Sequence, residues 1–149
     1  MDAGISIREM AGADAVAVAR LSEELGYPVC AGVMEQRIRD RAALEDRAAF
    51  VACDGESVIG WIEVGVVTRL QVAPYADVGG LVVAGGFRGN GVGCRLVSRA
   101  EQWARDRNLN KIIVRSNIVR EDAHRFYARE GYEKTKTSAV FSKELRSGP

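Results

Sequence analysis

A glycine-rich segment, Ala84 to Gly93, does most to limit what this chain can fold into. It follows an apolar run, Val78 to Val83, that is typical of a strand. After it, apolar residues recur at helical spacing: Val92, Leu96, Ala100 and Trp103. The order strand, glycine-rich turn, helix is therefore predicted. Because the first N–H groups of a helix are unpaired and lie at the positive end of its dipole, such a turn can bind an anion.

The spacing of the glycines excludes two common phosphate-binding loops. A dinucleotide-binding GxGxxG fingerprint would need glycine at position 94, where the sequence has Cys94. A Walker A loop would need Lys and then Ser or Thr after its last glycine, but Gly91 is followed by Val92 and Gly93. The pattern that remains is Arg88-x-x-Gly91-x-Gly93.

This pattern resembles the acetyl-CoA-binding loop of the GNAT N-acetyltransferase superfamily, although Gly85 stands where that family commonly has a proline. A second hallmark of the family has a counterpart in Ser116-Asn117 followed by Phe126-Tyr127-x-x-x-Gly131-Tyr132. The expected order of strands and helices also matches, so the resemblance covers nearly the whole chain. It implies direct transfer of an acetyl group from acetyl-CoA to a primary amine, without an enzyme nucleophile or a metal.

The same resemblance implies which residues bind acetyl-CoA. The main chain of the loop would hold the pyrophosphate through Arg88, Gly89, Asn90, Gly91, Val92 and Gly93. The strand before it would pair with the pantetheine arm through Leu81, Val82 and Val83, and a main-chain N–H near Leu81 would polarise the thioester carbonyl. Asn117 matches a position whose side chain commonly lies near the cofactor.

Tyr127 matches the tyrosine that often protonates the departing CoA thiolate in this family, and a placed general acid typically adds about 10²- to 10⁴-fold in rate. The alternative is that Tyr127, beside Phe126, only packs against the interior. The amine must also lose its proton, because an ammonium group has no lone pair. Asp77 lies four residues before Leu81 on the same expected strand, where some relatives place a carboxylate base. Glu63 and a chain of waters are the alternatives to Asp77.

The 149 residues are expected to form a single domain, 1–149, with an α/β (α+β) fold. Asp54-Gly55 between two apolar runs is a strong hairpin signal, because glycine adopts the positive φ of a primed turn without strain. Two helices are expected before that hairpin, and a short one over 121–130 is expected to end at Gly131. A final antiparallel pair is expected over 132–136 and 139–145. Together with the family's fold, this predicts a central mixed, mostly antiparallel sheet of about six or seven strands, flanked by about four helices.

The charges are divided unevenly along the chain, although the net charge is only +1. Residues 1–84 carry 7 basic and 13 acidic side chains, whereas residues 85–129 carry 10 and 4. Because CoA is anionic, the basic segment suits the cofactor and the acidic segment suits a small cationic amine as acceptor. The charged residues of the expected second helix, 33–47, are interpreted as a solvated face. Trp61 is assigned either to the core or to the acceptor cleft.

Other features limit the partners and the compartment. The near-neutral balance excludes the basic excess of a general nucleic-acid-coating protein. Three widely spaced cysteines and one histidine do not make the pattern of a disulfide framework or a zinc site. No apolar stretch approaches the ~20 residues of a membrane span, so a cytoplasmic protein without a membrane partner is expected. A homodimer, an acetyltransferase for protein N-termini or lysines, and a non-catalytic CoA-binding sensor stay open as alternatives.

Overall fold

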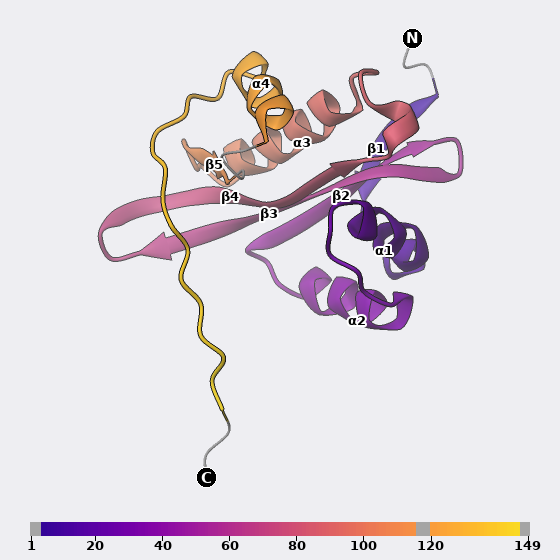
Figure 1. The fold of residues 1–149 in the computed structure, drawn as a ribbon, viewed down its shortest axis with the longest axis horizontal. Coiled ribbons are helices and arrows are strands. Elements are labelled where there is room, and N and C mark those ends of the chain that lie inside the picture. The colour runs from indigo at the N-terminus through magenta and orange to yellow at the C-terminus, as the bar shows by residue number, and fades with distance from the viewer. Residues whose placement is uncertain (1–3, 116–119, 147–149) are drawn as a thin grey trace. The chain divides into compact units, whose positions relative to one another are not determined.

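The computed structural model describes residues 4–115 and 120–146 of the chain. Its strands and α-helices follow the order β1, α1, α2, β2, β3, β4, α3, β5, α4 (Figure 1). The chain divides into two compact units, residues 1–115 and residues 116–149. The first unit contains every element from β1 to β5, and the second contains α4.

Five strands form one mixed sheet in the first unit, in the spatial order β1-β2-β3-β4-β5. Their bounds are Ile5–Glu9 for β1, Arg47–Asp54 for β2, Ser57–Arg69 for β3, Val72–Val83 for β4 and Ile112–Val114 for β5. The first four strands pair antiparallel in sequence order, and β5 pairs parallel with β4. Gly55 has φ +62 in the turn between β2 and β3, as the Asp54-Gly55 signal predicts. The mostly antiparallel mixed sheet with flanking helices confirms the expected fold class.

Helices cover both faces of this sheet (Figure 1). Helices α1 (Ala15–Glu24) and α2 (Ala31–Ala42) lie on one face, and α3 (Val92–Asp106) lies on the other. Val51 of β2 belongs to a buried cluster with Leu21 of α1 and Ile38 of α2. Its neighbour Phe50 instead lies under the guanidinium of Arg99 on α3, 4.3 Å from the ring centroid to Cζ. This difference follows from the strand, in which successive side chains point to opposite faces. Among the described residues, no helix combines the length and apolar character needed to cross a membrane.

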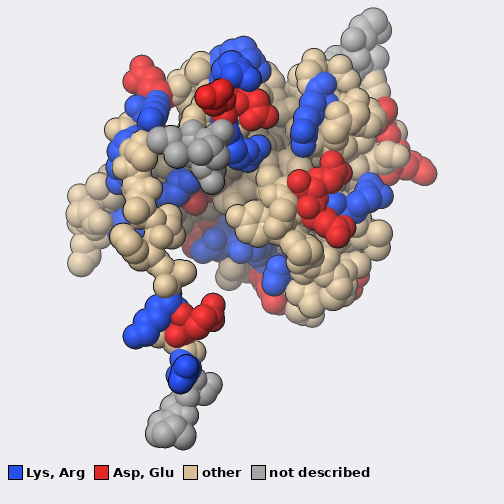
Figure 2. Space-filling model, in the orientation of Figure 1, with Lys and Arg blue, Asp and Glu red and all other residues tan. Residues whose placement is uncertain are grey.

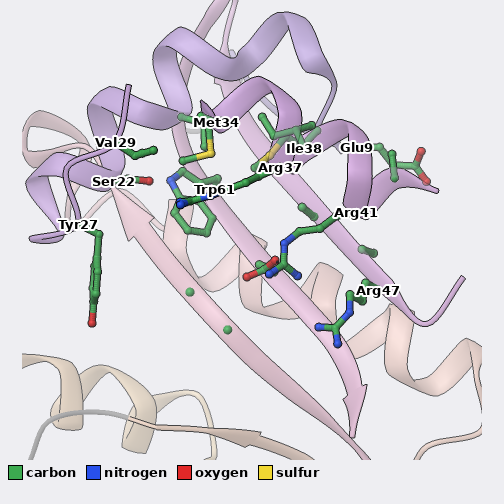
Figure 3. Close-up of a pocket in the computed structure, with 18 of the residues that line it drawn as sticks. Glu9, Ser22, Tyr27, Val29, Met34, Arg37, Ile38, Arg41, Arg47 and Trp61 are labelled. Atoms are coloured by element: carbon green, nitrogen blue, oxygen red, sulfur yellow. The ribbon is translucent and has the colours of Figure 1, made fainter. Parts of the chain in front are cut away.

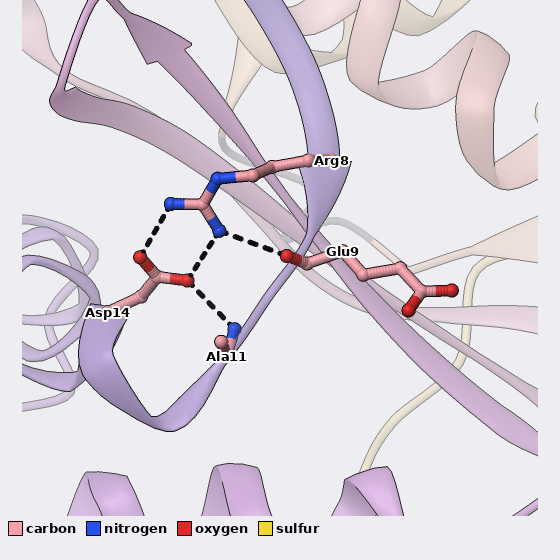
Figure 4. Close-up of polar contacts among 4 residues, drawn as sticks. All are labelled: Arg8, Glu9, Ala11 and Asp14. Carbon is pink, nitrogen blue, oxygen red and sulfur yellow. Dashed lines mark hydrogen bonds and ion pairs between the residues drawn. The ribbon is translucent and has the colours of Figure 1, made fainter.

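An ion pair fixes the turn from β1 into α1 (Figure 4). Nη1 and Nη2 of Arg8 donate to Oδ2 and Oδ1 of Asp14, each at 2.8 Å. The backbone N–H of Ala11 also donates to Oδ2 of Asp14, at 2.8 Å. The Asp14 side chain is only 7% exposed, and the hydrogen bonds from Arg8 hold the pKa of its carboxyl below the usual range. A buried carboxylate is stable here because each of its oxygens accepts a charge-assisted hydrogen bond.

The second unit contains α4 (Glu121–Arg129), and Gly131, with φ +90, follows the end of that helix as predicted. The predicted strands over 132–136 and 139–145 are wrong, because residues 132–146 form neither helix nor strand. The described part of the chain therefore has five strands rather than six or seven. Val140 and Phe141 are adjacent and would point to opposite faces of a strand, so the segment has no single apolar face to bury. Both side chains are exposed, at 89% and 93%.

Candidate active site

The glycine-rich turn leads from β4 into the N-terminus of the 15-residue helix α3. Gly89 and Gly91 have φ of +86° and +79°, a backbone conformation that residues with a side chain rarely adopt. Nothing lies within 4 Å of a Cβ built on either residue. Nε of Arg88 donates to the carbonyl oxygen of Val83 at 3.3 Å and so joins the turn to the end of β4. Since α3 begins at Val92, its unpaired N–H groups lie at this exposed turn. The chain thus forms an open, donor-rich cradle of the kind that holds a phosphate group.

One edge of β4 next to the turn is not paired with any other strand that the structure describes in the first unit. The register between β3 and β4 shifts between Glu63 and Val64, where Gly79 is an extra residue in β4 and forms a β-bulge. On its other edge, β4 pairs with β5 only through Ala76, Asp77 and Val78. Within the described part of the first unit, no strand lies beside residues 79–83 on that edge. The N–H and C=O groups there can pair with an extended ligand, as an edge strand does with a peptide.

A pocket of about 520 Å³ is lined by β1, α1, α2 and the strands β2 to β4 (Figure 3). This volume lies in the range of about 300 to 1,000 Å³ that is typical of small-molecule sites. A second pocket of about 180 Å³ adjoins it. Four residues line both pockets: Arg41, Arg47, Glu63 and Gly79. Because Gly79 is the bulge residue of β4, the pockets lie beside the strand segment that precedes the glycine-rich turn.

Two glycines of β4 make room for the pocket side chains that β3 contributes. A Cβ on Gly80 would lie 2.8 Å from the indole ring of Trp61, and a Cβ on Gly79 would lie 2.8 Å from Oε1 of Glu63. Trp61 lines the larger pocket and also packs against the buried cluster beneath α1 and α2. Its expected packing against the core is confirmed, and its place in an acceptor cleft stays a prediction. Its Nε1 is buried and has no hydrogen-bond partner among the described residues.

Each of the two candidate bases is held by an arginine. The carboxylate of Asp77 pairs with Nη1 of Arg115, and Nη2 of Arg115 donates to the hydroxyl of Tyr75 at 3.5 Å. Oε2 of Glu63 lies 2.6 Å from Nη1 of Arg41. Asp77 lines the smaller pocket, whereas Glu63 lines both. Both carboxylates are therefore next to the space that an acceptor would occupy, and the assignment of the base to Asp77 stays a prediction.

The family follows from comparison with known proteins. A family model described as "Acetyltransferase (GNAT) family" matches residues 17–132, which include the glycine-rich turn and Tyr127. This chain belongs to the GNAT acetyltransferase family. It is an acetyl-CoA-dependent N-acetyltransferase, as the loop pattern and the second hallmark predict.

Individual relatives show how far the likeness of this GNAT acetyltransferase extends. An aminoalkylphosphonate N-acetyltransferase from Salmonella typhimurium is 32% identical over 121 residues, which cover 77% of this chain and 73% of the relative. The aminoglycoside 6'-N-acetyltransferase AAC(6')-Ih from Acinetobacter baumannii matches with a TM-score of 0.80 at 21% identity, over 95% of this chain and 99% of that one. AAC(6')-Iy in complex with CoA matches with a TM-score of 0.83 at 16% identity, over 95% of each chain. These two structures confirm the GNAT fold.

Tyr127 belongs to α4 of the second unit. Its ring makes edge contacts with Phe126 and Tyr132, at 5.2 and 5.8 Å between ring centroids. Burial raises the pKa of Tyr127 above its usual value, and the charge of Arg120 opposes this shift only in part. The phenol is therefore protonated at neutral pH, as a proton donor must be. The predicted cofactor residue Asn117 lies outside the described residues.

The arginines of the larger pocket differ from the prediction that the charges of 33–47 form a solvated face. Arg37 and Arg41 of α2 and Arg47 of β2 line the pocket. The spacing i, i+4 of Arg37 and Arg41, on the side of α2 that carries the buried Ile38, could have indicated this. On the face drawn in Figure 2, acidic and basic side chains are intermixed, so the uneven division of charge along the sequence does not form separate fields there.

Proposed function

We propose that this GNAT acetyltransferase transfers the acetyl group of acetyl-CoA to the primary amine of a small molecule bound in the pocket of about 520 Å³. The observation that carries this proposal is the position of the pocket, which shares Gly79 and Gly80 with the part of β4 that has a free edge. The Salmonella relative acts on aminoalkylphosphonates, and several solved structures of the same fold are aminoglycoside acetyltransferases. Both acceptor classes are small amines, which supports a small molecule over a protein as the acceptor.

Acetyl-CoA supplies an acyl group activated as a thioester, and the first unit has the donors to bind it. The open positions at Gly89 and Gly91 and the N-terminus of α3 fit a pyrophosphate. The free edge of β4 at Leu81, Val82 and Val83 fits the amide groups of the pantetheine arm. A main-chain N–H near Leu81 would then polarise the thioester carbonyl, a contribution that is worth roughly 3 to 4 kcal/mol in comparable sites.

Proton transfers complete the proposed reaction. The amine nitrogen forms the new C–N bond while the C–S bond of the thioester breaks. The bound ammonium first loses one proton, for which Asp77 is the proposed acceptor and Glu63 the alternative, and its lone pair then attacks the thioester. The sulfur gains one proton from Tyr127, and the second proton that the nitrogen loses as the amide forms restores the phenol. The raised pKa of Tyr127 supports its role as the donor, because the phenol keeps its proton until it is needed.

A competition experiment tests whether the acceptor is a small molecule. Free CoA thiol is measured with a panel of small primary amines and, in parallel, with peptides that carry a free N-terminus or a lysine. We expect release with at least one small amine and a much lower kcat/KM with every peptide. Efficient turnover of a peptide would contradict the proposed acceptor. A stabilising shift in Tm with acetyl-CoA, but no turnover of any amine, would indicate the CoA-binding sensor instead.

A further inference from the structure

We infer that the acceptor of this enzyme carries an acidic group in addition to its amine, and that Arg37, Arg41 and Arg47 bind that group. This inference rests on the proposed transfer to a small amine and adds the class of the acceptor. The acidic group is an oxyanion, such as a phosphonate, phosphate, sulfonate or carboxylate.

The charged side chains of the larger pocket have a small basic excess. Of the residues that the structure describes, three arginines and two glutamates, Glu9 and Glu63, line it. Figure 3 shows Arg37 and Arg41 extending from α2, and Arg47 from β2, into the pocket. Most of the 13 acidic residues of 1–84 therefore lie outside this pocket. An acceptor with several ammonium groups would meet three guanidinium groups here, and like charges repel.

Two of these arginines have N–H donors that remain available to a ligand. Arg37 makes no hydrogen bond or ion pair within residues 4–115 and 120–146. Arg47 has one long ion pair, with 3.9 Å between its Nε and Oδ1 of Asp46. The side chains of Arg47 and Asp46 are both exposed. The third arginine, Arg41, is already held by Glu63 at 2.6 Å, which fixes its guanidinium at the pocket. Planar guanidinium groups with free N–H donors match the geometry of phosphonate and carboxylate oxygens.

A buried donor in the same pocket also lacks an acceptor. Nε1 of Trp61 is buried without a hydrogen-bond partner in the described residues, and the indole ring occupies the space that a Cβ on Gly80 would need. Buried N–H groups are almost always paired, and an unpaired one is costly. An oxyanion in the pocket would supply acceptors for the arginines, and for this indole N–H if the ring shifts toward the pocket.

The opposite end of the acceptor is placed by Glu63. Among the acidic residues that the structure describes, it alone lines both pockets, and its Oε1 lies 2.8 Å from where a Cβ on the bulge residue Gly79 would be. A primary ammonium beside Glu63 would lie next to the β4 segment proposed to hold the thioester. Its acidic substituent would then point toward Arg37 and Arg47.

Matched pairs of amines test this inference. 3-Aminopropylphosphonate, O-phosphoethanolamine, taurine and β-alanine are compared with propylamine, ethanolamine and the polycation spermidine in the thiol-release assay. We expect at least one amine that carries an anionic group to exceed the amines without one by roughly 10- to 100-fold in kcat/KM, as charge-assisted hydrogen bonds predict. The four anionic arms identify which oxyanion is preferred. Equal or better turnover of propylamine, ethanolamine or spermidine would overturn the inference.

Variants assign the effect to the arginines. Arg37→Gln and Arg47→Gln should raise KM for the preferred anionic amine by a much larger factor than KM for propylamine, and Arg47→Lys should restore part of the loss. Arg39→Gln is the matched control, because Arg39 lies on α2, pairs with Glu35 and does not line the pocket. If all amines lose activity equally in the two variants, the assigned residues are wrong.

Binding without turnover separates this inference from the proposed function. Isothermal titration of 3-aminopropylphosphonate into wild-type enzyme with CoA present should show saturable binding that Arg47→Gln weakens. If no amine is acetylated but this binding is seen, the proposed function fails and the anion site stands. If the four anionic amines neither bind nor react, the anion site is overturned.

Discussion

Nη1 of Arg41 on α2 lies 2.6 Å from Oε2 of Glu63 on β3, at the boundary between the two pockets. The arginine side chain is 45% exposed and the glutamate 23%, so the pair adds little to stability and its main effect is to position both groups. Gly79 leaves space for the other carboxylate oxygen of Glu63. The charge at the acceptor site is thus set by two elements that are distant in the sequence.

Neutralising the two candidate bases one at a time separates a proton acceptor from a residue that positions the amine. Asp77→Asn should lower kcat by roughly 10²- to 10⁴-fold, because it removes the proposed acceptor of the amine's proton. Glu63→Gln should mainly raise KM for the amine, because it removes the negative charge beside the ammonium. Steady-state kinetics at saturating acetyl-CoA measure both effects. The reverse pattern would assign the base to Glu63, and a normal kcat in both variants would assign it to water.

Tyr127→Phe should lower kcat while binding of acetyl-CoA stays unchanged. Burial raises the pKa of Tyr127, so the phenol is protonated below its ordinary value of about 10 and loses its proton only above it. Wild-type kcat should therefore show no alkaline fall caused by Tyr127 below about pH 10. The pH profiles of kcat for the two proteins measure this. An equal kcat for Tyr127→Phe and wild type at every pH would leave Tyr127 with a packing role against Phe126 and Tyr132.

Gly80→Ala tests how β4 holds the acceptor site. The new Cβ would lie 2.8 Å from the Trp61 ring, so the indole must move. We expect KM for the amine to rise roughly tenfold, equivalent to about 1.4 kcal/mol, with little change in KM for acetyl-CoA. Overpacking should also lower the free energy of unfolding by about 1 to 3 kcal/mol. Gly32→Ala is the control, because nothing lies within 4 Å of that position. Unchanged kinetics in Gly80→Ala would mean that Trp61 does not shape the site.

Asp14→Asn tests the ion pair with Arg8. The loss of charge-assisted hydrogen bonds should lower the free energy of unfolding by about 2 kcal/mol at pH 7. Because the folded-state pKa of Asp14 is lowered, its stabilisation is complete above its ordinary pKa of about 3.9 and is lost as the pH falls through the lower folded value. Urea unfolding at several pH values should show the difference from wild type shrinking below about pH 4. Asp40→Asn, an exposed change on α2, should have little effect; a pH-independent difference for Asp14→Asn would contradict the account.

Local signals in the sequence predicted the parts of the fold that depend on local chemistry. The Asp54-Gly55 turn and the glycines at 89 and 91 each require a backbone conformation that glycine adopts readily, so they could be read from the chain. The larger pocket could not be predicted in this way, because Arg41, Arg47 and Trp61 converge on it from three different elements. The final strands were wrong for a related reason, since pairing and burial rather than local alternation decide whether a strand forms.

Transfer of a labelled acetyl group tests the central claim most directly. Wild-type enzyme is incubated with acetyl-CoA labelled with ¹³C in the acetyl group and with the preferred small amine, and mass spectrometry follows the label. We predict an N-acetylated amine that carries the label, in equal amount to the CoA thiol released. Gly91→Asp should abolish product formation, because its carboxylate would oppose the pyrophosphate, whereas Gly32→Asp should retain it. Release of CoA thiol without labelled amine, or full activity in Gly91→Asp, would contradict this account.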